Sequence, residues 1–256
     1  MNVLEATDIH LSFAGVKAIH GVSFHVAPQE LFAIIGPNGA GKTSLFNVLS
    51  GVYKPQSGRV VFNGTNLARK RPHAIAAMGI ARTFQNVELF TNLTVLDNLM
   101  LGRHNHLPYG TLAAFAWLGK ASRQETASRL FVERIIEFLE LEQWRRMPVG
   151  LLPYGVQKRV ELGRALATEP KLLLLDEPVA GMNLEETEDM ARWILDIREE
   201  LNIPIIIVEH DMGLVMDLAD RVMAVDFGRH VATGTPGQIQ HHPDVIRSYL
   251  GQVTPA

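Results

Sequence analysis

The chain has 256 residues, 47% of them hydrophobic, and a formal net charge of -3 at pH 7. This hydrophobic content argues against disorder. The charge gives no electrostatic reason to expect a nucleic-acid ligand, which would favour a basic face. The chain contains no cysteine, which excludes disulfides and thiolate metal sites and is compatible with a reducing cytoplasm.

No segment is predicted to cross a membrane. A spanning helix needs about 20 consecutive apolar residues, whereas apolar runs such as Leu31–Ile35, Leu172–Leu175 and Ile203–Val208 have the length of strands. The N-terminus lacks the basic and apolar regions of a signal peptide. If the protein works at a membrane, we therefore expect a partner to supply the membrane part.

The first part of the chain predicts strands around one helix. Val22, Phe24 and Val26 alternate with polar residues, as in a half-buried strand. The continuous apolar run Leu31–Ile35 is typical of a strand covered on both faces, and a helical pattern follows from Gly41 to Val48. Further on, the apolar segment 60–62 ends at Asn63-Gly64, which predicts a hairpin strand.

The middle of the chain, from about residue 86 to 151, has helical periodicity and little strand character. One apolar stripe at helical spacing consists of Leu130, Phe131, Ile135, Phe138 and Leu139. The segment His104–Lys120 is rich in Gly, Pro and aromatic residues and gives no prediction. We expect this middle part to be a lobe inserted into an α/β core.

The last part of the chain alternates between helices and buried strands. Helices are predicted over Val156–Ala167 and Glu185–Leu201, and strands over Leu172–Leu175 and Ile205–Val208. Such alternation predicts a mainly parallel sheet with right-handed crossovers.

A phosphate-binding loop is predicted between the strand Leu31–Ile35 and the helix that follows it. The residues fit the pattern G-x-x-x-x-G-K-[ST] in the strand–loop–helix context that the motif requires. Backbone N–H groups of such a loop point at phosphate oxygens, Lys42 can reach the β- and γ-phosphates, and the Thr43 hydroxyl is placed to ligate Mg²⁺. The alternative, a glycine-rich turn with a solvated lysine, leaves the full pattern unexplained. The candidate nucleotide-binding residues are Gly36, Pro37, Asn38, Gly39, Ala40, Gly41, Lys42, Thr43 and Ser44.

Two acidic residues follow the apolar strand Leu172–Leu175. The exit of a strand in an α/β sheet is where such folds place their ligands. Asp176 is therefore predicted to hold Mg²⁺ through its water shell, and Glu177 to polarise the attacking water. Two acids after a strand would alone indicate a solvated loop, but together with the phosphate loop they favour a nucleotide site.

With these motifs in place, the chain resembles the nucleotide-binding subunits of ATP-binding-cassette (ABC) transporters along its whole length. The resemblance implies an α/β P-loop NTPase (RecA-like) core with a mainly parallel sheet, an N-terminal antiparallel β subdomain and an inserted helical subdomain. It implies ATP and Mg²⁺ as cofactors. We expect the core and β subdomain over residues 1–85 and 160–256, and the helical subdomain over residues 86–159.

Other family motifs follow in order. Gln85, in Arg82–Asn86, matches the loop glutamine whose amide contacts Mg²⁺ and the attacking water. His210, after the strand Ile205–Val208, matches the histidine that contacts the γ-phosphate, and Phe13 matches the aromatic residue that stacks on adenine. Taken singly, each has a plainer interpretation: a loop amide for Gln85, a satisfied polar residue for His210 and a core aromatic for Phe13.

The family's signature loop, L-S-G-G-Q, is the motif from which this chain departs most. Pro153 replaces its serine, Tyr154 its first glycine and Val156 its glutamine, while Asn183 replaces an aspartate of the D-loop. Gly155 and the helix N-terminus after it are still suited to bind phosphate. The changes would suit an asymmetric heterodimer with one weaker composite site. The residues expected to contact a nucleotide on a second subunit are Tyr154, Gly155, Val156 and Gln157.

A narrower resemblance is to the high-affinity branched-chain amino acid uptake ATPases. It rests on the runs Ala81–Asn86, Leu89-Phe90 and Leu93–Asn98, on the Tyr-Gly variant of the signature loop, on Glu209–Met212, on the long insertion His104–Lys120 and on the tail Pro243–Gly251. Urea and amide importers are similar, so the transported solute stays open at this point.

The resemblance implies a peripheral subunit on the cytoplasmic face of the inner membrane. Its expected partners are a second ABC ATPase subunit, transmembrane permease subunits and, indirectly, a solute-binding protein. Two alternatives are a non-transport ATPase of the same superfamily and a non-hydrolytic, ATP-dependent clamp.

Overall fold

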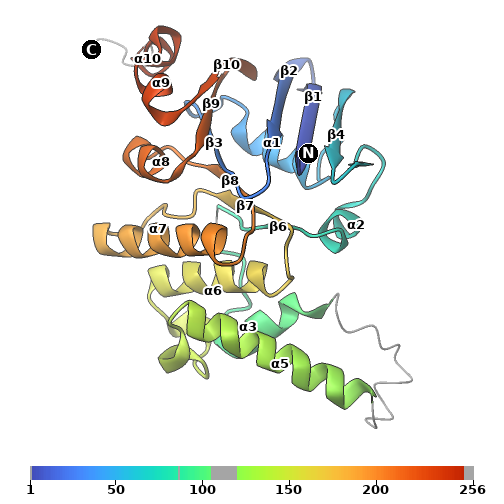
Figure 1. Cartoon of the computed structure of the whole chain (residues 1–256), viewed down its shortest axis with the longest axis vertical. Coiled ribbons are helices and arrows are strands. Elements are labelled where there is room, and N and C mark those ends of the chain that lie inside the picture. Colours follow the sequence, from blue (N-terminus) through green and yellow to red (C-terminus); the bar gives the residue numbers. More distant parts are fainter. Residues whose placement is uncertain (1, 86, 105–119, 251–256) are drawn as a thin grey trace. The chain divides into compact units, whose positions relative to one another are not determined.

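The computed structural model describes residues 2–85, 87–104 and 120–250. The chain forms two compact units, each built from more than one segment (Figure 1). Unit 1 comprises Met1–Arg82, Lys171–Glu177 and Ile194–Ala256, and unit 2 comprises Thr83–Pro170 and Pro178–Trp193.

Unit 1 contains a four-stranded antiparallel sheet. Its strand order is β2-β1-β4-β5, with bounds β1 Leu4–Phe13, β2 Val16–Val26, β4 Ser57–Phe62 and β5 Thr65–Asn66. The β1–β2 turn has positive φ at both central residues, 46° at Ala14 and 88° at Gly15, as a two-residue type I′ hairpin requires. The predicted alternation of Val22, Phe24 and Val26 and the hairpin at Asn63-Gly64 are both confirmed.

The second sheet of unit 1 has six strands in the order β10-β9-β3-β8-β7-β6. All neighbours are parallel except β9 and β10. The strands are β3 Leu31–Ile35, β6 Ile80–Arg82, β7 Leu172–Asp176, β8 Ile205–Val208, β9 Arg221–Asp226 and β10 Arg229–Gly234. Every residue of β3, β7 and β8 is buried, which confirms the prediction from their continuous apolar runs.

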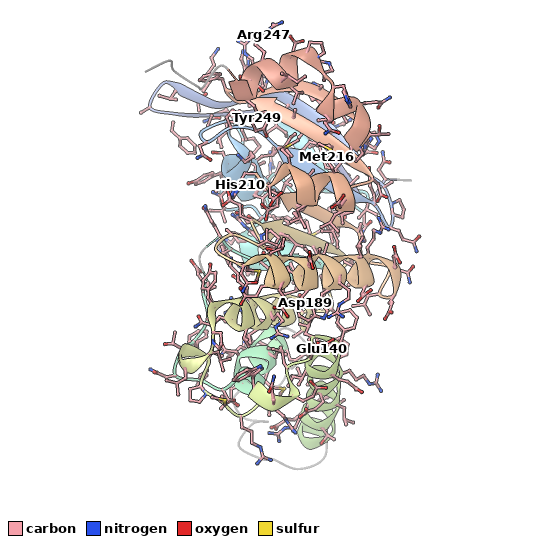
Figure 2. All side chains as sticks on the ribbon, turned by 90° about the vertical axis from the view of Figure 1, so that its left-hand side faces the viewer. Glu140, Asp189, His210, Met216, Arg247 and Tyr249 are labelled. Carbon is pink, nitrogen blue, oxygen red and sulfur yellow. The ribbon has the colours of Figure 1, made fainter. Side chains whose placement is uncertain are left out.

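Unit 1 also contains helices. They are α1 Lys42–Leu49, α2 Pro72–Ala77, α8 Met212–Leu218, α9 Pro236–Gln240 and α10 Pro243–Leu250, while α7 Leu184–Glu199 contributes residues to both units. In Figure 2, Arg247 and Tyr249 lie on α10 and His210 lies beside α8. Burial raises the pKa of the Tyr249 hydroxyl to about 12.

The core of unit 1 is apolar and includes the fully buried Phe32, Phe46 and Phe62.

Unit 2 is mainly helical. Its elements are α3 Val95–Gly102, α5 Lys120–Phe138, the short 3₁₀ helices η2 Glu142–Trp144 and η3 Val149–Leu151, and α6 Tyr154–Leu166. Helix α6 therefore lies wholly in unit 2, whereas the predicted lobe ended at residue 159. At the crossing of these helices Gly163 approaches Leu99, Ile135 and Leu139 closely.

The apolar stripe predicted for α5 is only partly correct. Ile135 and Leu139 are buried, but Leu130 is 60% exposed. Over residues 124–139 the buried positions are Ser128, Val132, Ile135, Ile136 and Leu139, which follow a helical repeat that begins with a small polar residue. The predicted stripe left out Val132 and Ile136, although both are apolar, and it left out the polar Ser128.

Some predicted features lie outside the described residues. They are Asn86, most of the segment His104–Lys120 and Gly251. Among the helices that are described, none is long and apolar enough to cross a bilayer.

Candidate functional site

The phosphate loop connects β3 to α1, and its backbone is packed too closely to admit side chains at two positions. A Cβ at Gly36 would lie 2.1 Å from the carbonyl oxygen of Val225, and one at Gly41 would lie 2.4 Å from that of Ala18. Gly41 is also the N-cap of α1 and has a left-handed φ of 101°. Both approaches are to backbone atoms, so only glycine fits. The loop therefore presents main-chain groups at the N-terminus of a helix, which is an arrangement suited to anions.

Lys42, the first residue of α1, is buried beside this loop. Its side chain is 5% exposed, and its Nζ donates to the carbonyl oxygens of Gly36 at 2.5 Å and Pro37 at 3.1 Å. Burial lowers the pKa of Lys42, and the neighbouring carboxylates of Glu177 and Asp176 oppose that shift. A desolvated ammonium group of this kind binds phosphate more strongly than an exposed one.

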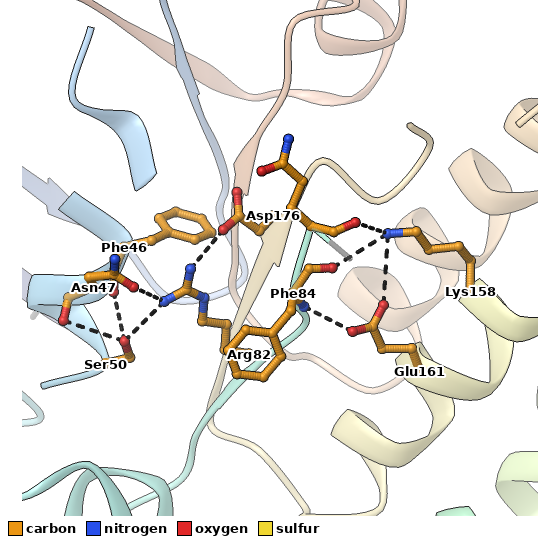
Figure 3. Close-up of polar contacts among 9 residues, drawn as sticks. Phe46, Asn47, Ser50, Arg82, Phe84, Lys158, Glu161 and Asp176 are labelled. Carbon is orange, nitrogen blue, oxygen red and sulfur yellow. Dashed lines mark hydrogen bonds and ion pairs between the residues drawn. The ribbon is translucent and has the colours of Figure 1, made fainter. Parts of the chain in front are cut away.

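Asp176, at the end of β7, is 2% exposed and held by an arginine from the neighbouring strand (Figure 3). Arg82 Nη2 donates to Asp176 Oδ2 at 2.7 Å, and its Nη1 donates to Asn47 Oδ1 at 2.6 Å. The guanidinium also lies over the Phe46 ring, 5.6 Å from its centroid. Two residues of α1 and the last residue of β6 thus fix the orientation of the carboxylate.

Glu177 has an unusual backbone conformation, with a left-handed φ of 48°. Its amide donates to Val208 O at 2.9 Å, which anchors it to the end of β8. Conformations of this kind cost about 1–3 kcal/mol and gather at functional sites. His210 Nδ1 lies 3.9 Å from Glu177 Oε2 and 3.8 Å from the fully buried Glu209. The His210 side chain is 58% exposed, so it faces solvent at the edge of the carboxylates.

Phe13 lies at the end of β1 and is 44% exposed. Its ring meets the Tyr53 ring edge-on, with centroids 5.0 Å apart. The residue is therefore a surface aromatic and not part of the core, which leaves a ring face for stacking.

The signature region belongs to unit 2, and its departures from the family pattern have local partners. A Cβ at Gly181 would lie 3.2 Å from the Tyr154 ring, so the tyrosine packs on the backbone of the D-loop. Asn183 Oδ1 accepts from the Glu186 amide, and Glu186 Oε2 accepts from the Asn183 amide, both at 3.0 Å. Asn183 is thus the N-cap partner in a reciprocal capping pair at the start of α7.

Helix α6 starts with Pro153 as its N-cap, without a side-chain cap. Gln157 Nε2 donates to Leu152 O at 2.9 Å, so this amide supports the loop that precedes the helix. Gly155 and Val156 are buried in the first turn.

The structure groups the predicted residues in two sets. Lys42, Asp176, Glu177, His210 and the phosphate loop lie in unit 1, and Phe13 is in the same unit. Gln85 and residues 154–157 lie in unit 2. The Gln85 side chain is exposed, and its carbonyl oxygen accepts from Lys158 Nζ at 2.9 Å.

Comparison with known proteins decides the family. A family model described as "ABC transporter" matches residues 19–180. The chain is an ATP-binding subunit of the ABC transporter family. A second model, described as "Branched-chain amino acid ATP-binding cassette transporter", matches residues 229–253 of this ABC subunit. The ABC subunit accordingly binds and hydrolyses ATP, and its fold is that of a P-loop ATPase cassette.

Similar proteins cover nearly its whole length. The high-affinity branched-chain amino acid transport ATP-binding protein BraF of Pseudomonas aeruginosa is 38% identical over 98% of both chains. LivG of Escherichia coli, which carries the same description, is 40% identical over 98% of both chains. A nucleotide-free ATP-binding cassette and an ADP conformation of a cassette each superpose with a TM-score of 0.85, at 32% and 31% identity over 98% of this chain.

Sequence reasoning missed four charged residues that contact predicted site residues, or residues beside them, within their own unit. Arg82 was read only as part of the motif around Gln85, and Glu209 only as part of the run before Met212. Lys158 and Glu161 were not singled out, although both are buried in α6. The available signal was that a charged residue at the end of a strand or on the inner face of a helix needs a partner.

Mg²⁺, which the family implies, is compatible with the residues present. No group of three or more His, Asp or Glu side chains that could hold a metal occurs in the described part of the chain. Mg²⁺ is commonly bound by only one or two carboxylates together with phosphates and water. A carboxylate can accept at several positions, so the Arg82 contact is compatible with metal-bound water on Asp176.

Proposed function

We propose that this ABC subunit powers the import of branched-chain amino acids through a membrane permease. The observation that carries the proposal is the similarity to BraF and LivG over 98% of the chain, supported by the separate match of residues 229–253. In this proposal the subunit is peripheral and sits on the cytoplasmic face of the inner membrane, where permease subunits supply the membrane part. A separate solute-binding protein presents the amino acid to the permease.

The proposed chemistry begins with phosphate binding at the loop before α1. Main-chain N–H groups between Gly36 and Thr43 would surround the terminal phosphates, and Ser44 would add its backbone to the helix N-terminus. Lys42 would exchange its contacts with the Gly36 and Pro37 carbonyl oxygens for phosphate oxygens. The exchange favours ATP because the ammonium is already largely desolvated.

The metal site would use the Thr43 hydroxyl, Asp176 and Gln85. Mg²⁺ bound there would neutralise charge that develops on the β- and γ-phosphates. Asp176 is suited to this role because Arg82 holds its carboxylate in one orientation.

Glu177 is proposed to orient the attacking water and accept its proton. Its constrained backbone and its 15% exposed side chain support this role, since both favour one fixed direction for the carboxylate. His210, 3.9 Å away, would reach the γ-phosphate from the solvent side. Phe13 would stack on the adenine ring.

Two subunits would enclose two nucleotides head to tail. Each composite site would join the phosphate loop of one chain to residues 152–157 of the other. Tyr154, Gly155, Val156 and Gln157 are the proposed contacts of the second chain. Hydrolysis would remove the γ-phosphate contact and let the subunits separate, which transmits force only if ATP binds the closed state more tightly than the open state.

The proposal is tested by purification followed by reconstitution. The tagged chain is extracted from membranes in detergent, the proteins bound to it are identified, and the complex is placed in vesicles containing ATP. We expect a permease to co-purify, and ATP-dependent uptake of leucine, isoleucine or valine that Glu177→Gln abolishes. Uptake of urea or amides instead would change the solute but keep the motor. Phosphate release by a chain with which no permease co-purifies would favour a non-transport ATPase. ATP binding without phosphate release would favour a clamp.

A further inference from the structure

Three backbone groups of Phe84 and Gln85 are hydrogen-bonded to charged side chains of helix α6, and Figure 3 shows those at Phe84. Lys158 Nζ donates to the carbonyl oxygens of Gln85 at 2.9 Å and Phe84 at 3.4 Å. Glu161 Oε1 accepts from the Phe84 amide at 3.0 Å. The Phe84–Gln85 segment is thereby bound from both sides, through its N–H and its C=O groups, to one helix of the same unit.

Lys158 and Glu161 also form a pair with each other. Lys158 Nζ lies 3.8 Å from Glu161 Oε2, one helical turn away, and each side chain is only 2% exposed. Burial raises the pKa of Glu161, and the Phe84 amide and Lys158 oppose that shift. A buried ion pair gains little stability over apolar residues of similar volume, because desolvation offsets the attraction. Stability is therefore a poor explanation for charges at these two positions.

The same helix carries the signature residues in its first turn. Helix α6 begins at Tyr154, one turn before Lys158, and the Tyr154 ring lies within 5.9 Å of Lys158 Nζ. Because an α-helix is stiff over so short a distance, any displacement of the first turn also displaces the groups that hold Phe84 and Gln85.

We propose that Lys158 and Glu161 are positioning residues that lock the Gln85 backbone to the signature helix. The Gln85 side chain, at the nucleotide of its own chain, and residues 154–157, at the nucleotide of the second chain, then move as one body, so that hydrolysis is permitted only when both are in place. The inference rests on the proposed role of Gln85 in hydrolysis. It assigns no contact with ATP to Lys158 or Glu161 themselves.

The test uses the complete transporter and compares Gln85→Ala, the apolar double variant Lys158→Met/Glu161→Leu, and the three changes together. The double variant replaces both charges, because removal of only one would leave an uncompensated buried charge. We expect its kcat to fall on the order of 10- to 100-fold, as small misplacements near a reacting centre do, with little change in the KM for ATP. The double variant should cause no further loss in a Gln85→Ala background.

Two further variants separate positioning from a general structural effect. Lys158→Met/Glu161→Gln keeps an oxygen acceptor for the Phe84 amide without leaving an unpaired buried charge, and it should retain more turnover than Lys158→Met/Glu161→Leu. Arg103→Met, which breaks the Arg103–Glu169 pair elsewhere in unit 2, should lower stability but leave kcat nearly unchanged. Hydrogen exchange at the Phe84 amide should be faster in the double variant and normal in Arg103→Met.

The possible failures are distinguishable. Normal turnover of Gln85→Ala would overturn the proposed role of Gln85, and with it the catalytic purpose of the lock. If Gln85→Ala loses turnover but the double variant adds a further, independent loss, the lock is wrong while the role of Gln85 stands. An unchanged exchange rate at Phe84 would also overturn it.

Discussion

The phosphate loop of unit 1 and the signature region of unit 2 have the same proposed task, phosphate binding, and perform it under different constraints. In the phosphate loop, backbone packing restricts which residues fit, because the Gly36 and Gly41 positions leave no room for a Cβ. The motif of this loop is intact. The signature region has changed residues, and its neighbours accommodate the changes. Tyr154 packs on Gly181, and Asn183 caps α7 together with Glu186. A site defined by main-chain geometry tolerates little change, whereas one built from side-chain contacts can be rebuilt locally.

The largest effect is expected at Glu177, on the unit 1 side of this comparison. Glu177→Gln removes the proposed proton acceptor and should reduce kcat for ATP hydrolysis by about 10²–10⁴-fold, while ATP binding is retained and the closed dimer is favoured. Phosphate release measures the loss of kcat, and an ATP-binding assay measures whether affinity is retained. Glu185→Gln, an exposed carboxylate in the first turn of α7, is the matched control. Near-normal turnover of the Glu177 variant would remove this residue from the mechanism.

The backbone constraint itself can be broken at Gly41. Gly41→Ala places a Cβ against Ala18 O and keeps a left-handed residue, so the free energy of unfolding should fall by about 2–4 kcal/mol and ATP affinity with it. Gly39→Ala is the matched control, because Gly39 has a φ of +82° but no atom within 4 Å of the added Cβ. It should cost only about 1 kcal/mol. Denaturant unfolding curves check both values, and equal losses would mean that crowding does not constrain the loop.

A smaller effect is expected at the surface aromatic of β1. Phe13→Ala should weaken ATP affinity by about 1–3 kcal/mol if the ring stacks on adenine as aromatic side chains stack on bases. Val16→Ala, across the same hairpin and 70% exposed, should leave affinity unchanged. Isothermal titration with ATP measures both. Unaltered binding by the Phe13 variant would limit this ring to its contact with Tyr53.

The smallest effect is expected at the signature region. Tyr154→Ala removes the packing on Gly181 and should lower the free energy of unfolding by about 1 kcal/mol, with less effect on kcat than Glu177→Gln. Leu151→Ala, at a residue 72% exposed just before α6, is expected to be neutral. A loss of turnover as large as that of Glu177→Gln would show that the signature side chains are as constrained as the phosphate loop.

Elements with strong local signals could be predicted from sequence. Strands β3, β7 and β8 have continuous apolar runs, and the phosphate loop has a fixed spacing, so each was found from neighbouring residues alone. Contacts between distant residues could not be predicted in this way. Asp176 is held by Arg82, and the Gln85 backbone by Lys158; both pairings arise only when separate segments come together.

The domain bounds illustrate the same point. Helix α6 has one uninterrupted helical pattern, and nothing local within it tells which lobe it joins. Its membership of unit 2 follows from its packing on α3 and α5. The roles proposed for Glu177, Phe13, Tyr154 and Gln85 stay predictions that the variants above can test.

One residue, Gly228, links the phosphate loop to strand β2 through its two backbone hydrogen-bonding groups. Its N–H donates to Ala40 O at 2.9 Å, and its C=O accepts from the His20 amide of β2 at 2.6 Å. A β2 displacement would thus pull on the turn between β9 and β10, which in turn grips the residue before Gly41. Because β2 belongs to the antiparallel sheet, a displacement of that sheet would be transmitted through this turn to the phosphate loop. The stiffness of the turn would set how much of the displacement reaches the loop.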